Sequence, residues 1–506
     1  MFQGTGSSVG KSMLCTAVLR IMKQDGYTVA PFKAQNMALN SYATSEGLEM
    51  GRAQVVQAEA ACIEPSVYMN PVLLKPTSDR RSQVIVNGRP IGTMSAAEYE
   101  VYKPQLRQAV KKTYDELESR VDYVVIEGAG SPAEINLHDG DIVNMSMAKA
   151  ADAPVILIGD INPGGVFASL YGTVKLLPPD EQERIRGIII NKFRGDLKIL
   201  EPGLVMMEEL LGIPVLGVIP WMDVDIEDED SVTERFERRS SGGQIKVSVV
   251  HLPHISNFTD FNIISADKDV SMRYVKSVSE LEGSDIVILP GTKNTIEDLN
   301  WLKQRGLADR ITRFGRGGGM VIGICGGYQM LGETIRDPHH TESRIPEIAG
   351  LGLLNFDVEF LDEKTTVQSV GTVSCTQGWL AEHNGLMLDG YEIHSGVNTF
   401  GPACIPFLSL NGRDEPDGVI NRTGNILGTY LHGIFDTGVF WRAVTDHIRS
   451  EKGISASGDE ILTMAEFKDR EFNRLADIVR TNLDMEAVYK IIRGEEVQCT
   501  RWKNDI

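Results

Sequence analysis

Short runs of β-branched and other apolar residues recur along the chain and alternate with stretches of helical periodicity. The runs cover residues 121–126, 154–158, 187–190, 245–251, 285–289 and 320–324. Apolar runs of this length are typical of strands that are buried on both faces. Amphipathic stretches such as residues 97–120 lie between them, and several runs end in Gly, Asp or Asn. The pattern predicts an α/β protein with doubly wound parallel sheets.

A change of composition divides the chain. Six of the eight residues from 223 to 230 are acidic, and a stretch rich in Ser, Gly and Arg follows. This composition is typical of a linker between domains, although an acidic surface loop within one domain remains an alternative. After residue 440 the only clear pattern is a helical one, at residues 468–492. We expect one domain at residues 1–222, an acidic linker at 223–243, a second domain at 244–450 and a helical tail at 451–506.

The composition argues against several classes of protein. The chain has 506 residues, with 50 Lys and Arg against 70 Asp and Glu, so its formal net charge is −20. This charge disfavours nucleic acid or an anionic membrane as the main partner. The apolar stretches fall short of the ~20 residues that span a bilayer, and an export signal is not recognisable, so we expect a cytoplasmic protein. The six cysteines show no CxxC spacing and favour neither a disulfide framework nor a zinc site.

A glycine-rich segment near the start of the chain predicts a nucleotide site. Residues 4–12 read Gly-Thr-Gly-Ser-Ser-Val-Gly-Lys-Ser, and a helical pattern follows at 13–24. In such a loop the backbone N–H groups bind phosphate oxygens, the lysine neutralises the β- and γ-phosphates, and the serine hydroxyl ligates Mg²⁺. The loop is one residue longer than the usual motif, and only two residues precede Gln3, so the first strand is expected to be short. The expected ATP-binding residues in the loop are Gly4, Thr5, Gly6, Ser8, Gly10, Lys11 and Ser12.

Polar residues at the ends of predicted strands extend this site. Glu127 follows the run at 121–126, where ligand sites of α/β proteins gather, and with Ser12 it is a candidate Mg²⁺ ligand. Asp141 is a further candidate, although it also suits a helix N-cap. Asn191 follows the run at 187–190, and its amide can pair with a purine edge or simply form a turn.

A second chemical centre is predicted around one thiol. Cys325 follows the run at 320–324, with glycines at positions 323, 326 and 327. This is the pattern of a nucleophile elbow, in which a sharp turn between a strand and a helix exposes the nucleophile. His432 ends another apolar stretch and is the candidate base for the thiol. Backbone N–H groups at Gly291 and Gly326 are candidates for an oxyanion hole.

Taken together, several segments resemble the cobyric acid synthase family of glutamine-dependent amidotransferases of cobalamin biosynthesis. The most specific ones are residues 31–41, 50–54, 69–76, 254–262 and 390–394. The resemblance implies a dethiobiotin-synthetase-like P-loop domain followed by a class I glutaminase domain. It also implies ATP- and glutamine-dependent amidation of the b, d, e and g carboxylates of adenosylcobyrinic acid a,c-diamide.

The resemblance raises the question of where an acidic protein holds a corrinoid polycarboxylate. Its site must be locally basic, and Lys33, Arg52, Lys75 and Arg80 are the first candidates. The polar residues of the family segments could line the corrinoid site, but they could equally pack the core or a subunit interface. The predicted substrate contacts are Lys33, Gln35, Asn36, Asn40 and Lys75, and a homo-oligomer is possible.

Besides its short first strand, the chain departs at two places from the patterns of the family and class that it resembles. Class I glutaminases often carry Pro-Glu after the histidine, but His432 is followed by Gly433 and Ile434, so we expect a Cys–His dyad. Asn162-Pro163 replaces the usual Asp-Arg before the paired glycines, which leaves the role of that charge pair open. Two alternatives are a cobyrinic acid a,c-diamide synthase and a P-loop ATPase switch with a non-catalytic glutaminase domain. Positions 4–9 lack the second lysine that such a switch usually has.

Overall fold

The chain forms two units whose sequences interleave. One consists of Met1–Met37, Met50–Glu229 and Lys468–Ile506, and the other of Ala38–Glu49 and Asp230–Phe467. The computed structural model describes residues 1–38, 40–78, 81–226, 242–402, 404–410, 416–455, 463–499 and 502. Most of the expected acidic linker, residues 227–241, lies outside the described residues, as does Arg80. The short segment Ala38–Glu49 therefore belongs with the later part of the chain.

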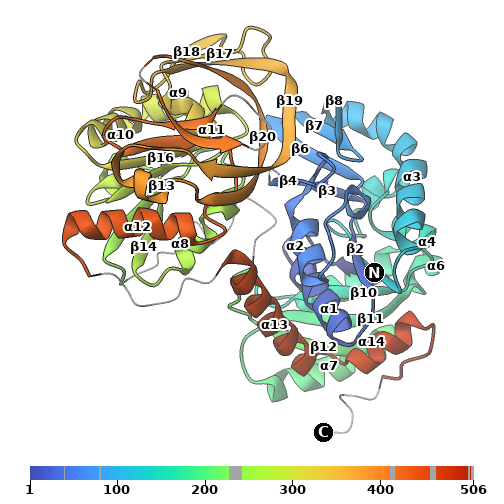
Figure 1. Cartoon of the computed structure of the whole chain (residues 1–506). Coiled ribbons are helices and arrows are strands. Elements are labelled where there is room, and N and C mark those ends of the chain that lie inside the picture. Colours follow the sequence, from blue (N-terminus) through green and yellow to red (C-terminus); the bar gives the residue numbers. More distant parts are fainter. Residues whose placement is uncertain are drawn as a thin grey trace. The chain divides into compact units, whose positions relative to one another are not determined.

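The first unit is built on parallel strands (Figure 1). Their order is β1 (Phe2–Gly4), β10 (Val155–Asp160), β11 (Ile185–Phe193) and β12 (Val215–Pro220), while β2 (Val29–Phe32) pairs with β9 (Tyr123–Ile126). A bridge between Phe2 and Glu127 joins the two sets. The strands predicted at 121–126, 154–158 and 187–190 are thereby confirmed. They are buried on both sides because helices pack against the sheet.

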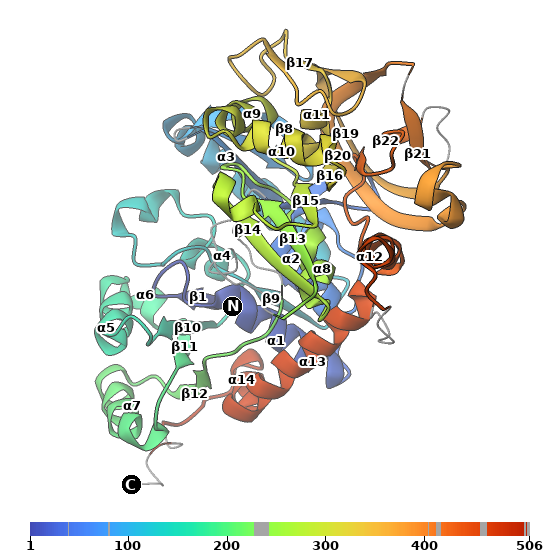
Figure 2. The same ribbon diagram turned by 90° about the vertical axis from the view of Figure 1, so that its left-hand side faces the viewer.

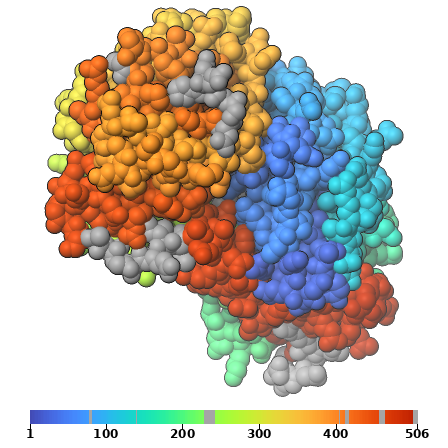
Figure 3. Space-filling view, in the orientation of Figure 1, coloured from blue at the N-terminus to red at the C-terminus, as the bar shows by residue number. Residues whose placement is uncertain are grey.

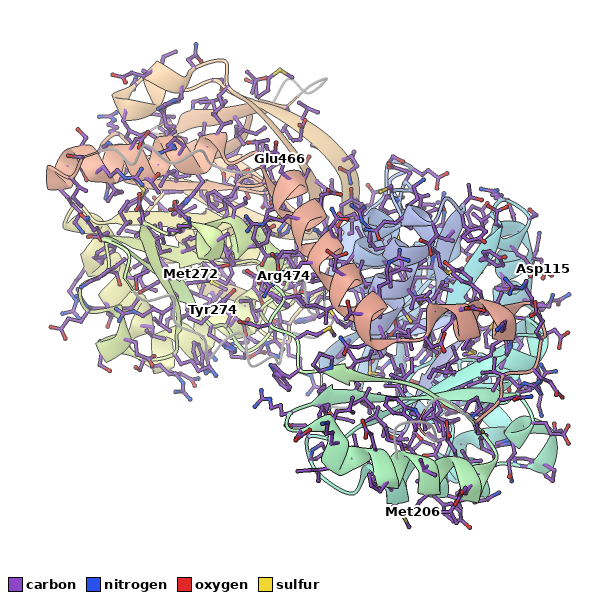
Figure 4. The ribbon with its side chains drawn as sticks, turned by 90° about the horizontal axis from the view of Figure 1, so that it is seen from below. Asp115, Met206, Met272, Tyr274, Glu466 and Arg474 are labelled. Atoms are coloured by element: carbon purple, nitrogen blue, oxygen red, sulfur yellow. The ribbon has the colours of Figure 1, made fainter. Side chains whose placement is uncertain are left out.

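The helices of the first unit follow the predicted alternation. They are α1 (Lys11–Gln24), α2 (Arg52–Ala60), α3 (Ala96–Glu118), α4 (Met145–Ala150), α5 (Val166–Leu176), α6 (Pro179–Gln182), α7 (Leu197–Leu211), the larger part of α13 (Met464–Asn482) and α14 (Met485–Ile492). Met206 on α7 and Asp115 on α3 mark the surface of this unit (Figure 4). Short 3-10 helices are η1 (Val67–Met69) and η2 (Ile135–Gly140).

A second sheet of the first unit was not predicted from the sequence. It has the order β3 (Gln35–Met37), β6 (Val72–Ser78), β7 (Arg81–Val86) and β8 (Arg89–Ser95), with antiparallel pairing from β6 to β8. Five of the seven residues of β8 are exposed, so it has no continuous apolar run. A strand with one or both faces in solvent lacks the signal on which the prediction relied.

The two last helices pack on the first helix of the chain. Leu475 and Val479 of α13 are fully buried in the same core as Leu14 and Val18 of α1. The C-terminal residues, in red, lie against the N-terminal ones, in blue (Figure 3). The helical pattern of the tail thus reflects a face that is buried on the nucleotide unit.

The second unit contains one mixed sheet. Its order is β14 (Val270–Val275), β13 (Ile245–Val250), β15 (Ile286–Leu289), β16 (Met320–Ile324), β23 (Ile426–Thr429), β22 (Pro416–Ile420), β21 (Ile405–Leu410), β19 (Phe356–Val373), β17 (Thr334–Arg336) and β18 (Glu347–Ala349), and β20 (Met387–Phe400) pairs with β19. The five strands from β14 to β23 are parallel, which confirms the predicted runs at 245–251, 285–289 and 320–324 (Figure 2). Met272 and Tyr274 mark the edge strand β14 (Figure 4). The antiparallel half was not predicted.

Helices flank the parallel half of this sheet. They are α8 (Asn262–Ala266), α9 (Thr295–Gln304), α10 (Leu307–Arg316), α11 (Gly326–Leu331) and α12 (Val439–Lys452), with 3-10 helices η4 (Phe258–Phe261), η5 (Val278–Leu281) and η6 (Gly378–His383). Strands β4 (Ser41–Ala43) and β5 (Glu49–Gly51) flank a tight turn. Within the described residues, no helix combines the length and the apolar character needed to cross a bilayer.

Candidate active sites

The glycine-rich loop connects β1 to α1, as predicted. Lys11 Nζ donates to the carbonyl oxygens of Gly6 at 2.8 Å, Ser7 at 3.0 Å and Gly130 at 3.1 Å. The N–H of Thr5 donates to Ile158 O at 2.9 Å and anchors the loop to β10. The loop therefore places a lysine ammonium beside backbone N–H groups at the start of a helix, where phosphate binds favourably.

Asn191 packs directly against this loop. Gly10 has φ +95°, and a Cβ there would lie 2.2 Å from Asn191 Nδ2, so a glycine is required. Asn191 Nδ2 donates to Val9 O at 2.8 Å, whereas its buried Oδ1 has no partner among the described residues. The structure also adds Lys192, which sequence reasoning missed and whose Nζ donates to Ser8 O at 2.6 Å. Asn191 thus supports the loop and keeps one acceptor available.

Glu127 is the centre of the polar cluster at the loop. Its side chain is fully buried, and Oε1 accepts hydrogen bonds from Ser12 Oγ at 2.8 Å and Lys33 Nζ at 2.9 Å. Gln57 Nε2 donates to Oε2 at 2.6 Å. The carboxylate and the serine hydroxyl are hard oxygen donors at the phosphate loop, and this donor set fits Mg²⁺ shared with phosphate oxygens.

Asp141 has a different environment. Its two oxygens accept the backbone N–H groups of Val143 at 2.9 Å, Asn144 at 3.0 Å and Ser146 at 2.8 Å. It therefore stabilises the turn that leads into α4, which corresponds to the capping alternative. In the described part of the chain, no group of three His, Cys, Asp or Glu side chains is arranged to hold a metal ion.

The residues predicted to contact the substrate are divided between the two units, and Gln35 and Asn36 lie on β3 next to β6, which carries Lys75. Gln35 accepts a hydrogen bond from Tyr99 at 2.6 Å, and Asn36 donates to Gln54 at 3.0 Å. Lys75 is buried in β6. Asn40 belongs to the second unit, where its Oδ1 accepts the N–H of Asn257 at 2.9 Å. Lys33 pairs with the carboxylate at the loop, as described above.

A large cavity adjoins the nucleotide loop within the first unit. Its volume is about 630 Å³, and its lining includes Ser7 and Gly130 at one end and apolar side chains such as Leu74, Val84 and Met94 along the walls. The lining also includes Gln35, Tyr99, Arg81 and Lys103. A mostly apolar cavity with a few polar groups beside a phosphate loop is typical of a site for a small-molecule substrate.

Cys325 lies in the sharp turn that the sequence predicts. Its φ of 51° and ψ of −111° are unusual for a residue other than glycine, and its side chain is 7% exposed. Its N–H donates to Thr429 O at 2.9 Å, so β23 supports the turn. A Cβ at Gly327 would lie 2.0 Å from Leu289 O, which explains the glycine there. This is the geometry of a nucleophile elbow.

His432 lies beside this thiol and is held by an acid that sequence reasoning missed. His432 Nδ1 and Asp260 Oδ2 are 2.7 Å apart, and Asp260 Oδ1 accepts the N–H of Gly433 at 3.1 Å. The ring of Tyr391 stacks on the imidazole with centroids 5.2 Å apart. The expected Cys–His dyad is therefore wrong, because Asp260 supplies the third member from η4 instead of from the position two residues after the histidine.

The surroundings of His432 favour its protonated form. Burial alone would lower the pKa of His432, but the charge of Asp260, its hydrogen bond and the interaction with Cys325 together raise this pKa to about 10. The nucleophile in thiol chemistry is the thiolate, and a protonated His432 places a positive charge beside it. The same proton is available for a leaving group.

The predicted oxyanion-hole residues lie around the same centre. A Cβ at Gly291 would lie 3.0 Å from His432 Cε1, and a Cβ at Gly326 would lie 3.1 Å from the backbone N of Thr292. Gly326 opens α11, so its N–H is at a helix N-terminus. The turn after β15 and the start of α11 thus approach each other beside the thiol and the imidazole.

A second polar network borders Cys325. Thr295 Oγ1 donates to Gln329 at 2.9 Å, and the N–H of Thr295 donates to Glu342 at 3.1 Å. Burial, partly offset by the charge of Lys293, raises the pKa of Glu342 to about 7. Burial lowers the pKa of Lys293, whose charge interacts with those of Glu342 and Cys325. Neither Glu342 nor Lys293 is among the main groups that shift the pKa of His432.

Comparisons with known proteins assign both units. Residues 1–232 match the family model of the CobQ/CobB/MinD/ParA nucleotide binding domain, and residues 246–440 match that of the CobB/CobQ-like glutamine amidotransferase domain. The chain therefore contains a nucleotide-binding domain followed by a glutamine amidotransferase domain. Among solved structures, PurLQS from Thermotoga maritima aligns with 46% of this chain and 97% of its own at 15% identity and a TM-score of 0.31.

Curated relatives match over nearly the whole chain. The cobyric acid synthase of Alkaliphilus metalliredigens is 52% identical over 98% of this chain and 100% of its own length. The cobyric acid synthase of Streptococcus sanguinis is 50% identical over 98% of this chain and 99% of its own. With both domain families matched in this order, the chain belongs to the cobyric acid synthase family, a family of glutamine-dependent amidoligases of cobalamin biosynthesis.

Proposed function

We propose that this enzyme converts adenosylcobyrinic acid a,c-diamide into adenosylcobyric acid by amidating the b, d, e and g carboxylates, with ATP and glutamine as cosubstrates. The observation that supports the proposal is that a chain of this family carries two arrangements of side chains suited to the two half-reactions. One combines Lys11, Ser12 and Glu127 at a phosphate loop, and the other combines Cys325 and His432 at a nucleophile elbow.

In the nucleotide unit, a substrate carboxylate would attack the γ-phosphorus of ATP, so that ADP leaves and an acyl phosphate forms. Lys11 would then turn from the loop carbonyls to the phosphate oxygens. Ser12 and Glu127 would hold Mg²⁺, which neutralises phosphate charge. Ammonia would attack the acyl carbon, form the amide bond and displace inorganic phosphate. Asn191 Oδ1 offers an acceptor for the nucleotide base.

In the glutaminase unit, the Cys325 thiolate would attack the side-chain amide carbon of glutamine. His432 would give its proton to the departing ammonia, while Asp260 keeps the imidazole oriented. The N–H groups at Gly291 and Gly326 would stabilise the oxyanion. Water would then cleave the thioester and release glutamate, so the thiol is regenerated.

The cavity beside the phosphate loop is our proposed corrinoid site. Its apolar walls suit the corrin ring, and Arg81 and Lys103 offer positive charge for the side-chain carboxylates. Ser7 and Gly130 are among its lining, so a carboxylate at that end would lie close to the phosphate loop. Glu100, Glu134 and Asp141 also line the cavity, and Lys103 pairs with Glu100 at 3.2 Å, so Mg²⁺ and the cationic side chains would have to offset these acidic residues around a polycarboxylate.

The test is a product analysis with two nitrogen sources. The purified enzyme is incubated with adenosylcobyrinic acid a,c-diamide, ATP, Mg²⁺ and either glutamine or ammonium, and the corrinoids are analysed by mass spectrometry. We expect the tetra-amidated product with both sources, and we expect Cys325→Ala to retain only the ammonium-dependent reaction. Absence of amidation of the a,c-diamide with either source, or glutamine use by Cys325→Ala, would refute the assignment.

A further inference from the structure

Residues 38–49 lie between parts of the nucleotide unit in sequence but pack in the glutaminase unit. Asn40 is 1% exposed, and its Oδ1 accepts the backbone N–H of Asn257 at 2.9 Å. Asn257 Nδ2 donates to Ser41 O at 3.3 Å and to the hydroxyl of Tyr391 at 2.8 Å. The segment is therefore held by two buried hydrogen bonds to Asn257, whose side chain also binds Tyr391.

Asn257 in turn positions the acid of the catalytic histidine. It has φ +53°, a left-handed conformation that asparagine tolerates better than most residues. Its carbonyl oxygen accepts the N–H of Asp260 at 3.1 Å and so starts the 3-10 turn η4. Asp260 then contacts His432 at 2.7 Å. Only Asn257 and Asp260 separate Asn40 from the imidazole.

A second route reaches His432 from the same segment. The ring of Tyr42 packs on that of Tyr391, with centroids 5.1 Å apart. Tyr391 stacks on the imidazole of His432, and the two residues exchange backbone hydrogen bonds of 2.9 and 3.2 Å. The segment thus supports the histidine through Asp260 on one side and through Tyr391 on the other.

The far end of the segment is anchored as well. Glu49 is 2% exposed and pairs with Lys364 of β19 at 2.6 Å. Gln368 of the same strand donates to the carbonyl oxygen of Ala43. These contacts bind the segment to the glutaminase along its length, so its position does not depend on Asn40 alone.

The chain on either side of the segment belongs to the nucleotide site. Lys33 precedes it by a few residues and pairs with Glu127, while Gly51 follows it and donates its N–H to Asn70 at 3.0 Å. Asn70 Nδ2 also donates to Lys33 O at 3.1 Å. Both flanks are thus connected to Lys33, whose side chain pairs with Glu127 at the phosphate loop.

We propose that residues 38–49 are a positioning segment that the nucleotide-site part of the chain contributes to the glutaminase, with Asn40 and Tyr42 as positioning residues for the Asp260–His432 pair. The proposal rests on the proposed function for its substrates only. It makes glutamine hydrolysis dependent on side chains that come from the synthetase part of the sequence, and these residues do not touch glutamine.

The test compares two nitrogen sources in matched variants. In Asn40→Ala the buried N–H of Asn257 loses its acceptor, and we expect the kcat of glutamine hydrolysis to fall by ~10- to 100-fold, as the loss of a buried hydrogen bond implies. The KM for glutamine and the ammonium-dependent amidation should change less than twofold, because neither uses His432. Tyr42→Ala should act in the same direction.

Two further variants serve as controls. Asn40→Asp keeps the Oδ1 acceptor, and a buried carboxyl can remain protonated, so we expect it to retain most of the kcat. Ser45→Ala changes an exposed residue of the same segment and should leave the kcat unchanged. Thermal unfolding of every variant shows whether it is folded.

The outcomes separate this proposal from the proposed function. The proposal would be overturned if Asn40→Ala and Tyr42→Ala both hydrolysed glutamine at the wild-type rate. It would also be overturned if these variants lost as much amidation activity with ammonium as with glutamine. If the wild type amidates no corrinoid, the proposed function fails. The positioning role is then still measured by the rate at which a glutamine-like diazo ketone alkylates Cys325.

Discussion

Replacing Asp260 by asparagine is the sharpest test of the glutaminase geometry. The two carboxylate oxygens of Asp260 accept one hydrogen bond each, from His432 Nδ1 at 2.7 Å and from the N–H of Gly433 at 3.1 Å. Both partners are donors. Asparagine has a single acceptor oxygen, so one of the two donors must face an NH₂ group. Asp260→Asn therefore keeps the shape but breaks one hydrogen bond and removes the charge.

The size of the effect follows from these contacts. Asp260 and His432 are 3% and 2% exposed, so solvent cannot replace the lost interaction. A hydrogen bond to a charged group contributes about 1.5–3 kcal/mol, which corresponds to roughly 10- to 150-fold in rate. We expect kcat/KM for glutamine hydrolysis to fall within this range, while amidation with ammonium stays unchanged.

The variant should also change the pH dependence. Burial opposes protonation of His432, but Asp260 and the interaction with Cys325 raise its pKa to about 10, so the wild-type imidazole stays protonated through neutral pH. Without the charge of Asp260 the pKa of His432 falls. The alkaline limb of the pH–rate profile should therefore move to lower pH in Asp260→Asn.

The assay is the release of glutamate from glutamine, measured between pH 6 and pH 10 with ATP and the corrinoid present. Asp269→Asn is the matched control, because Asp269 is in the same unit but pairs with Arg449 at 2.9 Å. It should retain the wild-type profile. Wild-type kcat/KM and an unshifted alkaline limb in Asp260→Asn would show that Asp260 does not orient the histidine.

Three other substitutions test separate parts of the structure. Lys11→Ala should lower amidation more than 100-fold with glutamine and with ammonium alike, because both reactions need ATP. Alkylation of Cys325 by a glutamine analogue should continue in this variant. Ammonium-dependent amidation near the wild-type level would contradict the role of Lys11. Leu475→Ala should cost about 2–5 kcal/mol of stability, since this α13 side chain is fully buried against α1; denaturant unfolding checks it, and an unchanged midpoint would contradict it. Burial raises the pKa of Glu342 from 4.5 to about 7, so the folded state binds this proton more tightly and stability falls as pH rises through that window. Glu342→Gln should make this slope shallower in denaturation at pH 4.5–7, where Asp417 also contributes because burial raises its pKa to about 6; an identical slope would contradict the assignment.

Features of short range were the ones that the sequence predicted well. The six predicted strands of the parallel sheets, the phosphate loop and the turn at Cys325 each depend on a few consecutive residues, and the structure contains all of them, whereas β2, β12 and β14 were missed. The buried strands have no polar face to interrupt their apolar runs. By contrast, 13 of the 18 residues of β19 and nine of the 14 residues of β20 are partly or fully exposed, so these strands carry a weak signal.

Partners of long range were the ones that the sequence missed. Asp260 lies 172 residues before His432, and Asn40 lies 217 residues before Asn257. Spacing along the chain carries no information about such pairs, because folding alone brings them together. Both Asp260 and Asn257 fall within the family segment 254–262, and that concentration of polar residues was the one available signal.

The glycine after His432 explains why the acid can come from so far away. Gly433 has φ +77°, a conformation that residues with a side chain rarely adopt. In this conformation its N–H points to the carboxylate that also holds His432. Asp260 thus fixes the imidazole and the backbone behind it at once, and an acid two residues after the histidine is not needed. Because η4 depends on Asn257, and Asn257 on Asn40, the orientation of the histidine is tied to residues next to the nucleotide site in sequence. A side chain at position 433 should therefore impair glutamine use even if it preserves Asp260.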